Sequence, residues 1–348
     1  MKKDVLYYMV FAAMIFTATM MNSCVTDDYG INNGDSPQIL DGKILDGYAI
    51  RAIAFDSKGN AWIGAFKKAN PENGKTQDCI IRYNGQETEI HNSENSIFDI
   101  AVDKNDNVWI GGSGGLLKYE GNKFTLYNSK NTAMPEDVAW TVAVDSKNNI
   151  WVASCRSKMG GLVKYDGKNW TAYTPDNSAL PDNLINDIAI DQSDNIWLTV
   201  NDYLIKKSND KWEVFDKEDL GLTNFIFAGL QFNSKNLLFG VSDHSFNGYA
   251  TQPPCELYSF DSKKANILSK IDNLTSMPGQ TKITIDSNDN VWCYGIGERN
   301  FVGVWIDDQW KQLESFELGV SNAWVIKEDN ERRIWIGTQN GIYIIKTN

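Results

Sequence analysis

The sequence predicts an all-β fold: a seven-bladed β-propeller of four-stranded blades, in which the N-terminal strand closes the last blade. Two observations lead to this prediction. A motif of the form Ile-Ala-x-Asp, then a turn, then Trp recurs roughly every 40 to 50 residues, which is a period typical of propellers. Between its copies, short β-branched or aromatic runs alternate with Gly, Asn and Asp turns, and no helical periodicity is visible.

Residues 1–23 have the pattern of a bacterial lipoprotein signal peptide. Two lysines near the start precede an apolar run that is short for a spanning helix, and the run ends at Ser23-Cys24, which resembles a lipobox. We therefore expect Cys24 to be lipidated and residues 24–37 to form a flexible tether. An ordinary signal peptide or an uncleaved anchor are the alternatives.

Acidic residues follow the cysteine directly, at Asp27 and Asp28, and resemble the export signal of surface lipoproteins. The sequence therefore predicts an outer membrane lipoprotein exposed on the cell surface, with the lipid anchor as its only contact with the membrane. The formal net charge of −12 argues against nucleic acid or anionic headgroups as partners, because both require basic patches.

The first and last strands predict how the ring closes. After Trp335 only one more strand-like run follows, at 341–346, so the seventh unit lacks a fourth strand. The strand-like segment from Gln38 to Leu45 precedes the first complete unit. We expect it to complete the seventh blade, so that the propeller spans 38–348 and no edge stays open between the chain ends.

Seven copies of the motif are present in between. The fifth is one residue short and has Leu238 in place of Trp. This regular repetition favours one domain over the two that 348 residues would suggest. The Trp position marks the copies in order: Trp62, Trp109, Trp151, Trp197, Leu238, Trp292 and Trp335.

Each unit reads as two hairpins. In the fourth unit, 188–190 and 196–199 are short strands around a polar turn at 191–195. In the third unit, 161–167 leads through a Gly turn into 169–173. We expect the run that ends at the turn Asp to be the innermost strand and the last run of the unit to be the outermost.

The turn itself has the form Asp-x-x-x-Asn, as at Asp103 and Asn107. Calcium binding is an alternative, but the loop lacks the Gly and distal Glu of an EF-hand. Asp and Asn are also the residues that a tight turn favours. We therefore interpret these residues as turn formers on one rim of the propeller, and the recurring Trp as a residue that packs between blades.

The cysteines other than Cys24 predict little. None has a metal-ligand spacing, so we expect small buried side chains. Cys255 and Cys293 would lie in neighbouring blades, and whether they form a disulfide stays open.

The second and third units, 100–140 and 142–187, resemble two-component-regulator propeller repeats, and the resemblance extends over roughly 38–348. In that family such propellers commonly form the extracytoplasmic sensor of hybrid histidine kinases that respond to glycans. No spanning helix, kinase or receiver segment follows the propeller up to Asn348, so we expect any signalling to pass through a partner.

Function in a propeller usually lies on the rim opposite the turns, where the variable loops gather around the channel mouth. One residue stands five positions before the turn Asp, at the entry to each inner strand. Aromatic faces beside Arg and Asn suit stacking on sugars or gripping a peptide, although aromatics could instead simply plug the channel. The predicted ligand-binding residues are Arg51, Phe98, Trp140, Asn186 and Trp324 at these entries, with Arg156, His244 and Arg299 in the loops.

Catalysis is not expected. Streptogramin B lyases have similar repeats and use a His and Glu site with magnesium, but the two histidines here, His91 and His244, show no such constellation. No nucleophile motif or phosphate loop is visible. We therefore predict a non-catalytic propeller without metal or cofactor that binds a glycan or protein ligand, as an accessory to sensing or uptake. A scaffold subunit of an outer-membrane complex is the alternative, and a lyase-like enzyme is less favoured.

Overall fold

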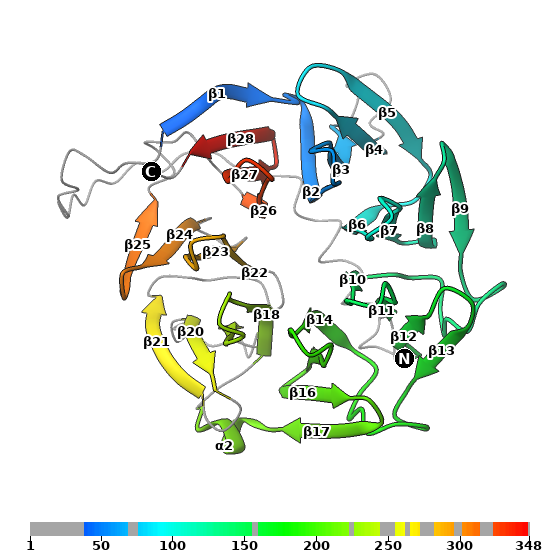
Figure 1. Ribbon diagram of the computed structural model, residues 1–348, viewed down its shortest axis with the longest axis vertical. Coiled ribbons are helices and arrows are strands. Elements are labelled where there is room, and N and C mark those ends of the chain that lie inside the picture. The colour runs from blue at the N-terminus through cyan, green and yellow to red at the C-terminus, as the bar shows by residue number, and fades with distance from the viewer. Residues whose placement is uncertain are drawn as a thin grey trace, which may run out of the picture. The chain divides into compact units, whose positions relative to one another are not determined.

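The computed structural model describes residues 38–68, 76–154, 159–222, 226–243, 255–261, 265–271, 282–295, 301–313 and 323–346. These residues form seven four-stranded antiparallel sheets set around a common centre (Figure 1). The predicted seven-bladed propeller is therefore confirmed. The chain divides into two units, 1–36 and 37–348, and the propeller is the second. The predicted signal peptide, the lipidated Cys24 and the tether lie outside the described residues.

In the first six blades the strands follow chain order from the centre outward, as the sequence predicted, and in the seventh the N-terminal strand is outermost. The first blade comprises β2 (Tyr48–Phe55), β3 (Ala61–Lys67), β4 (Gln77–Tyr83) and β5 (Thr88–Ser93). The second comprises β6 (Ile97–Val102), β7 (Val108–Gly112), β8 (Gly115–Glu120) and β9 (Lys123–Tyr127). The third comprises β10 (Thr141–Val144), β11 (Ile150–Ser154), β12 (Gly161–Tyr165) and β13 (Trp170–Tyr173).

The remaining blades repeat this order. The fourth comprises β14 (Ile185–Ile190), β15 (Ile196–Val200), β16 (Tyr203–Ser208) and β17 (Lys211–Phe215). The fifth comprises β18 (Ile226–Phe232), β19 (Leu238–Asp243), β20 (Cys255–Phe260) and β21 (Ala265–Ile271). The sixth comprises β22 (Lys282–Ile285), β23 (Val291–Gly295), β24 (Phe301–Ile306) and β25 (Gln309–Leu313). The seventh comprises β26 (Ala323–Glu328), β27 (Arg333–Thr338), β28 (Gly341–Lys346) and β1 (Gln38–Ile44).

Strand β1 confirms the predicted closure. It pairs antiparallel with β28, with Ile44 opposite Ile342, and so supplies the outermost strand of the seventh blade. The two ends of the propeller thus share one sheet, and each satisfies backbone groups that the other would leave unpaired.

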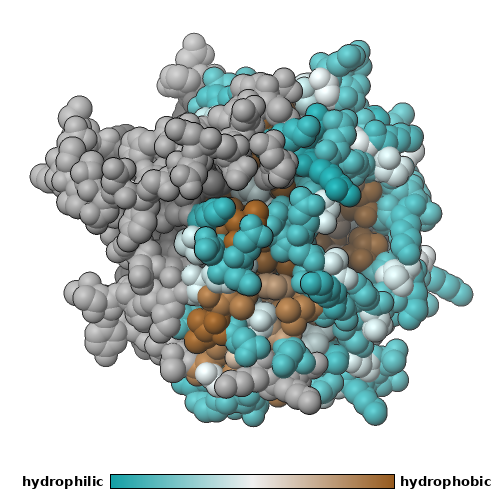
Figure 2. Space-filling view, turned by 60° about the vertical axis from the view of Figure 1, so that its left-hand side comes forward, coloured by the Kyte–Doolittle hydropathy of each residue, from teal (hydrophilic) through white to brown (hydrophobic). Residues whose placement is uncertain are grey.

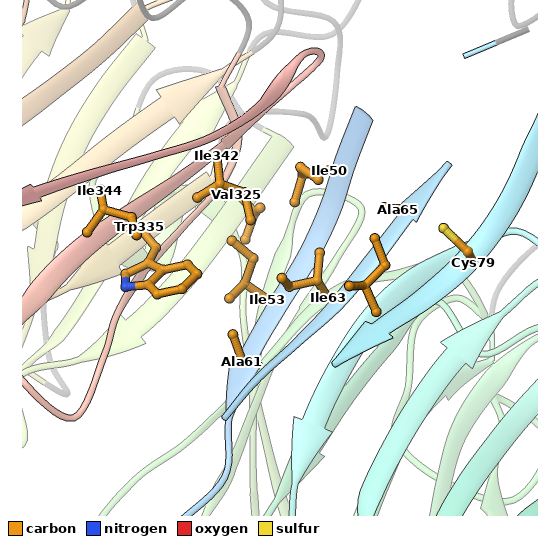
Figure 3. Packing of buried hydrophobic residues seen from close by; sticks show 11 residues of the cluster. Ile50, Ile53, Ala61, Ile63, Ala65, Cys79, Val325, Trp335, Ile342 and Ile344 are labelled. Atoms are coloured by element: carbon orange, nitrogen blue, oxygen red, sulfur yellow. The ribbon is translucent and has the colours of Figure 1, made fainter. Parts of the chain in front are cut away.

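Apolar side chains fill the spaces between neighbouring blades. Where the seventh blade meets the first, Trp335 and Ile344 pack against Ile50 and Ile53 (Figure 3). All four are at least 96% buried. Full burial of one such side chain stabilises a fold by about 1.5–3 kcal/mol, so these interfaces hold the ring together.

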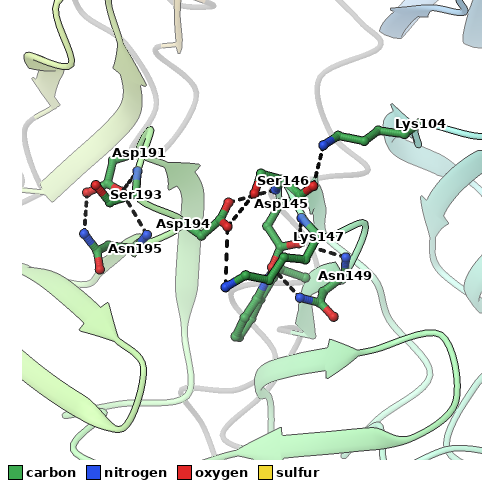
Figure 4. A network of polar contacts seen from close by, with 10 residues as sticks. Lys104, Asp145, Ser146, Lys147, Asn149, Asp191, Ser193, Asp194 and Asn195 are labelled. Atoms are coloured by element: carbon green, nitrogen blue, oxygen red, sulfur yellow. Dashed lines mark hydrogen bonds and ion pairs between the residues drawn. The ribbon is translucent and has the colours of Figure 1, made fainter.

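The Asp-x-x-x-Asn turns are confirmed as turns. In the third blade, the Asp145 carboxylate accepts hydrogen bonds from the backbone N–H of Lys147 and Asn149, from Asn149 Nδ2 and from Trp151 Nε1 (Figure 4). Asn148 lies in the left-handed region at φ 67°, which Asn tolerates. The recurring Trp therefore does more than pack: its ring is buried and its N–H donates to the turn Asp.

The same turns also join each blade to the next. The residue after the turn Asp donates to the left-handed residue of the following turn; Ser146 Oγ, for example, lies 2.5 Å from Asp194 Oδ2 (Figure 4). A bond at this rim spans every blade boundary, although the pairs differ at the last two. The pairs are Ser57–Asp106, Lys104–Asn148, Ser146–Asp194, Gln192–Asn236, Ser234–Asp289, Ser287–Glu328 and Asn330–Asp56.

A single helical turn, α2 (Lys217–Leu220), follows β17 and was not predicted. Asp216 and Asp219 form a capping box at the start of α2, and Gly221 ends the helix at φ 69°, so these local caps explain why a helical turn forms here.

No helix in the described part of the chain is long and apolar enough to cross a membrane. Figure 2 shows a largely hydrophilic surface with hydrophobic residues gathered near the middle of one face.

Among the cysteines, Cys79 and Cys293 are fully buried, as predicted for small apolar side chains. Burial raises the pKa of the Cys79 thiol to about 11. Whether Cys255 and Cys293 form a disulfide stays open, because the side chain of Cys255 lies outside the described residues.

Candidate functional site

The entry residues singled out in the sequence coincide with a β-bulge in the inner strand. In the second blade, Ile97 is opposite Gly112 and Asp99 is opposite Gly111, so Phe98 has no partner on β7. A bulge of this kind inserts one residue and re-aims its side chain. The same shift in register occurs at Arg51, Asn186, Ala228 and Trp324.

Trp140 occupies the equivalent place just before β10. Its backbone N–H donates to Ala153 O at 2.8 Å, and Ala153 is also opposite Thr141, so two residues here share one partner on β11. Thr281, the entry residue of the sixth blade, lies outside the described residues. The bulge residues therefore mark one end of the inner strands, and the Asp-x-x-x-Asn turns mark the other.

Four neighbouring blades bring aromatic rings together at this bulge rim. Phe98 and Trp140 form one pair, with ring centroids 4.9 Å apart and planes inclined by 43°. Trp324 and Phe66 form a second, with centroids 5.9 Å apart. The Cζ atom of Arg51 lies 4.4 Å from the Phe66 ring centroid, which is cation–π geometry. The rim from the seventh to the third blade, here named the aromatic half-ring, comprises Trp324, Phe66, Arg51, Phe98 and Trp140.

All five side chains of the half-ring are half-buried, so each keeps part of its surface for a ligand. The structure thus brings together Arg51, Phe98, Trp140 and Trp324 of the predicted set, with Phe66 as the link between Trp324 and Arg51. Phe66 was not singled out from the sequence. It begins a variable loop, and its role depends on a ring from a blade more than two hundred residues away in the chain.

Arg51 is held in place by a carboxylate. Its Nη1 lies 2.9 Å from Asp78 Oδ1, and the Ser96 hydroxyl lies 3.4 Å from the other oxygen of Asp78. Burial raises the pKa of Asp78, although the charge of Arg51 opposes this shift. Burial also lowers the pKa of Arg51. The pair therefore fixes the guanidinium over Phe66 at the cost of partly desolvating two charges.

Nearer the axis of the propeller, the inner strands carry charges of both signs. Asp99 accepts from the backbone N–H of Val142 at 2.9 Å, and Asp187 from that of Leu230 at 3.0 Å, so each carboxylate binds the inner strand of the next blade. Lys282 Nζ lies 3.7 Å from Asp187 Oδ1. Burial raises the pKa of Asp99, and the charges of Lys327 and Lys282 oppose that shift.

The other predicted residues are not joined to the half-ring. Arg156, His244 and Arg299 lie outside the described residues. Asn186 stands at the bulge of β14, half-buried, on the next blade after Trp140. His91 is on the outermost strand β5, and its ring centroid lies 5.1 Å from that of Phe124 in the second blade.

Comparisons with known proteins agree with this architecture. The family model described as two component regulator propeller matches residues 93–114, which run from the end of β5 through β7. No curated protein matches the chain.

Within the described residues, no group of three His, Cys, Asp or Glu side chains is placed to hold a metal ion.

Among solved structures, the extracellular domain of the putative hybrid two component system BT3049 from B. thetaiotaomicron has a TM-score of 0.66 at 17% identity. The alignment covers 90% of this chain and 41% of that one, so the propeller spans about two fifths of its length. A catalytically inactive virginiamycin B lyase from Staphylococcus aureus with quinupristin has a TM-score of 0.65 at 13% identity, covering 90% and 99%.

PorZ, a bacterial surface component of the type-IX secretion system of Porphyromonas gingivalis, has a TM-score of 0.60 at 14% identity, covering 84% and 46%. At these identities the likeness to solved structures shows the fold alone. The chain is therefore a seven-bladed β-propeller in which residues 93–114 match the two component regulator propeller model.

Proposed function

We propose that the propeller is a non-catalytic binding module and that the aromatic half-ring holds a glycan. The observation that carries this proposal is the arrangement at the bulge rim, where four neighbouring blades each direct an aromatic or Arg side chain to one arc. Aromatic faces stack on the apolar faces of sugar rings, and a fixed guanidinium offers donors to their oxygens.

A pure packing role for these rings explains less. Packing between blades is already provided by the buried Trp that follows the turn in six of the seven blades and by the aliphatic residues around it. The half-ring side chains are instead half-buried and are confined to one side of the rim. Their neighbour on the fourth blade is Asn186, and the bulge residue on the fifth is Ala228.

We further propose that the protein acts outside the cytoplasm as an outer membrane lipoprotein anchored through Cys24. The lipobox-like Ser23-Cys24 supports this localisation, and so does the likeness to extracellular domains of two component systems. Mass spectrometry of the membrane-extracted protein should find an acyl group on Cys24, and an unmodified N-terminus at this residue would contradict the anchor.

Glycan arrays and affinity gels with soluble protein from Asp27 onward test the binding function. We expect saturable retention by at least one polysaccharide, and loss of retention in Trp140→Ala and Trp324→Ala. If the folded wild-type protein is retained by no carbohydrate, the glycan-binding proposal is wrong.

Two other functions are kept as alternatives, each suggested by a protein that shares the fold. The likeness to PorZ favours a scaffold subunit of an outer-membrane complex, which a pull-down from detergent-solubilised membranes would reveal as stoichiometric protein partners. The likeness to virginiamycin B lyase favours an enzyme. The enzyme function would be established if the protein turns over a screened substrate and this activity is lost in His244→Ala.

A further inference from the structure

We infer that the ligand of the half-ring is an acidic saccharide, and that Arg51 binds the carboxylate of a uronic acid unit. This inference deepens the proposed function and depends on it. It starts from the way Arg51 is fixed: one face of its guanidinium lies over Phe66 and one nitrogen, Nη1, is bonded to Asp78. A guanidinium has five N–H donors in a rigid plane.

Among the described residues, Asp78 is the only hydrogen-bond partner of this guanidinium, so most of its donors remain for a ligand. The Arg51 side chain is 28% exposed. A carboxylate matches the two-pronged geometry of the guanidinium edge better than a hydroxyl does, and such charge-assisted bonds are roughly twice as strong as neutral ones.

Two further cations lie on the same part of the rim. Lys67 and Lys68 follow Phe66 directly, and both are exposed. Lys68 Nζ donates to Asn340 Oδ1 at 3.2 Å, which directs this side chain toward the seventh blade, where Trp324 stands. Two nearby carboxylates are each paired: Asp46 with Lys43 at 2.7 Å and Asp78 with Arg51 at 2.9 Å. The first blade thus presents local positive charge in a chain whose net charge is −12.

The aromatic pairs lie on either side of this charge. Trp324 and Phe66 come before Arg51 around the rim, and Phe98 and Trp140 come after it. Sugar units on both sides of a uronate could therefore stack while its carboxylate meets Arg51. Because flat aromatic rings on both sides of a cation can stack on the apolar faces of sugar rings, we infer a saccharide rather than an acidic peptide.

Affinity gel electrophoresis with three uronate polymers tests this inference: polygalacturonate, alginate and hyaluronate. Each is compared with its carboxyl-reduced, neutral form. We expect the wild-type protein to bind at least one acidic polymer about tenfold or more tightly than its reduced form, and Arg51→Gln to abolish the difference. The tenfold figure corresponds to the loss of one charge-assisted hydrogen bond.

Arg51→Gln leaves Asp78 partly buried without its cation, so the double variant Arg51→Gln with Asp78→Asn separates loss of binding from loss of folding. Lys58→Gln is the matched control, since it removes the same charge from the same blade on the opposite rim. If Lys58→Gln weakens binding as much as Arg51→Gln does, general attraction of a polyanion explains the result and the inference fails.

Two outcomes overturn the inference and leave the glycan-binding function intact: equal binding of acidic and reduced polymers that is lost in Trp140→Ala, or an unchanged acidic preference in the Arg51 variants. Equal retention of the protein by polyglutamate would indicate that the ligand is an acidic peptide and not a saccharide. Absence of binding to every carbohydrate would refute the proposed function itself.

Discussion

The two rims of the propeller are built from the ends of the same seven inner strands, yet they differ in what their residues do. At the turn rim, the same Asp bonds recur in nearly every blade, and a polar contact joins each blade to the next. At the bulge rim, the equivalent position changes from Arg to Phe, Trp, Asn and Ala. Repetition marks the residues that hold the blades in register, and variation marks the residues that are available for a ligand.

The fifth blade shows the same contrast within one rim. Asn233 replaces the turn Asp, and Leu238 replaces the Trp. Asn233 still accepts from the backbone N–H of Lys235 and Leu237, so the turn survives. The fifth blade lacks the hydrogen bond from an indole N–H, because the side chain of Leu238 has no donor. The backbone bonds alone are therefore enough to form the turn.

The largest expected effect is on stability, from a change at the turn rim. Asp103→Ala removes the acceptor of Asn107 Nδ2 and Trp109 Nε1 and of two backbone N–H groups, and it leaves buried donors unsatisfied. We expect the free energy of unfolding to fall by about 3 kcal/mol. Urea denaturation measures this change, and Asn233→Ala, which removes two backbone bonds, should cost about 1 kcal/mol.

A smaller effect, on binding rather than stability, is expected at the bulge rim. Trp140→Ala removes one ring of a half-buried pair, and a well-placed aromatic contributes about 2 kcal/mol to binding, or roughly thirtyfold in affinity. Unfolding should be perturbed less than in Asp103→Ala. If Trp140→Ala lowers the free energy of unfolding as much as Asp103→Ala does, the half-ring is part of the hydrophobic core. The separation into a stabilising turn rim and a binding bulge rim is then wrong.

The smallest effect is expected from the bonds between blades at the turn rim. Replacing Ser57, Ser146 and Ser234 by Ala removes bonds between exposed hydroxyls and half-buried carboxylates, each worth about 0.5 kcal/mol. The sites are in separate interfaces, so their effects should add. Ligand binding should not change.

This triple variant also has a defined pH dependence. The Ser hydrogen bonds hold the pKa of Asp106, Asp194 and Asp289 below the ordinary value of 3.8. Because the pKa is lower in the folded state, this stabilisation is complete above pH 3.8 and is lost as pH falls through the folded-state values. The difference between wild type and variant should therefore shrink in acid. A difference that grows below pH 3.8 would contradict the assigned bonds.

Much of the fold could be predicted from the sequence because repetition reveals it. The strand order, the degenerate fifth blade and the closure by 38–44 all follow from comparing one unit with the next. The bulges could not be predicted in this way. Side chains alternate with a period of two along a regular strand, and a sequence pattern assumes this period throughout. The extra residue at Phe98 becomes visible only when β6 is paired with β7.

The sequence predicted where the entry residue stands in each inner strand, but not which side chains contact it. Counting five residues back from each turn Asp found Arg51, Phe98, Trp140 and Trp324. It missed Phe66, which lies on the second strand, and the pairing of Arg51 with Asp78 on the third. It also missed the Asp99 and Asp187 contacts to the next blade, since the partner N–H groups lie more than forty residues further along the chain.

The pairing of β1 with β28 has a consequence for how the chain folds. Most strand pairs in the propeller are hairpins of neighbouring segments, whose loops close at little entropic cost. The β1–β28 pair instead joins residues that are about three hundred positions apart, and contacts of such high sequence separation form slowly. We therefore expect blades one to six to assemble before the seventh, and the closure of the ring to be the late step that limits the rate of refolding.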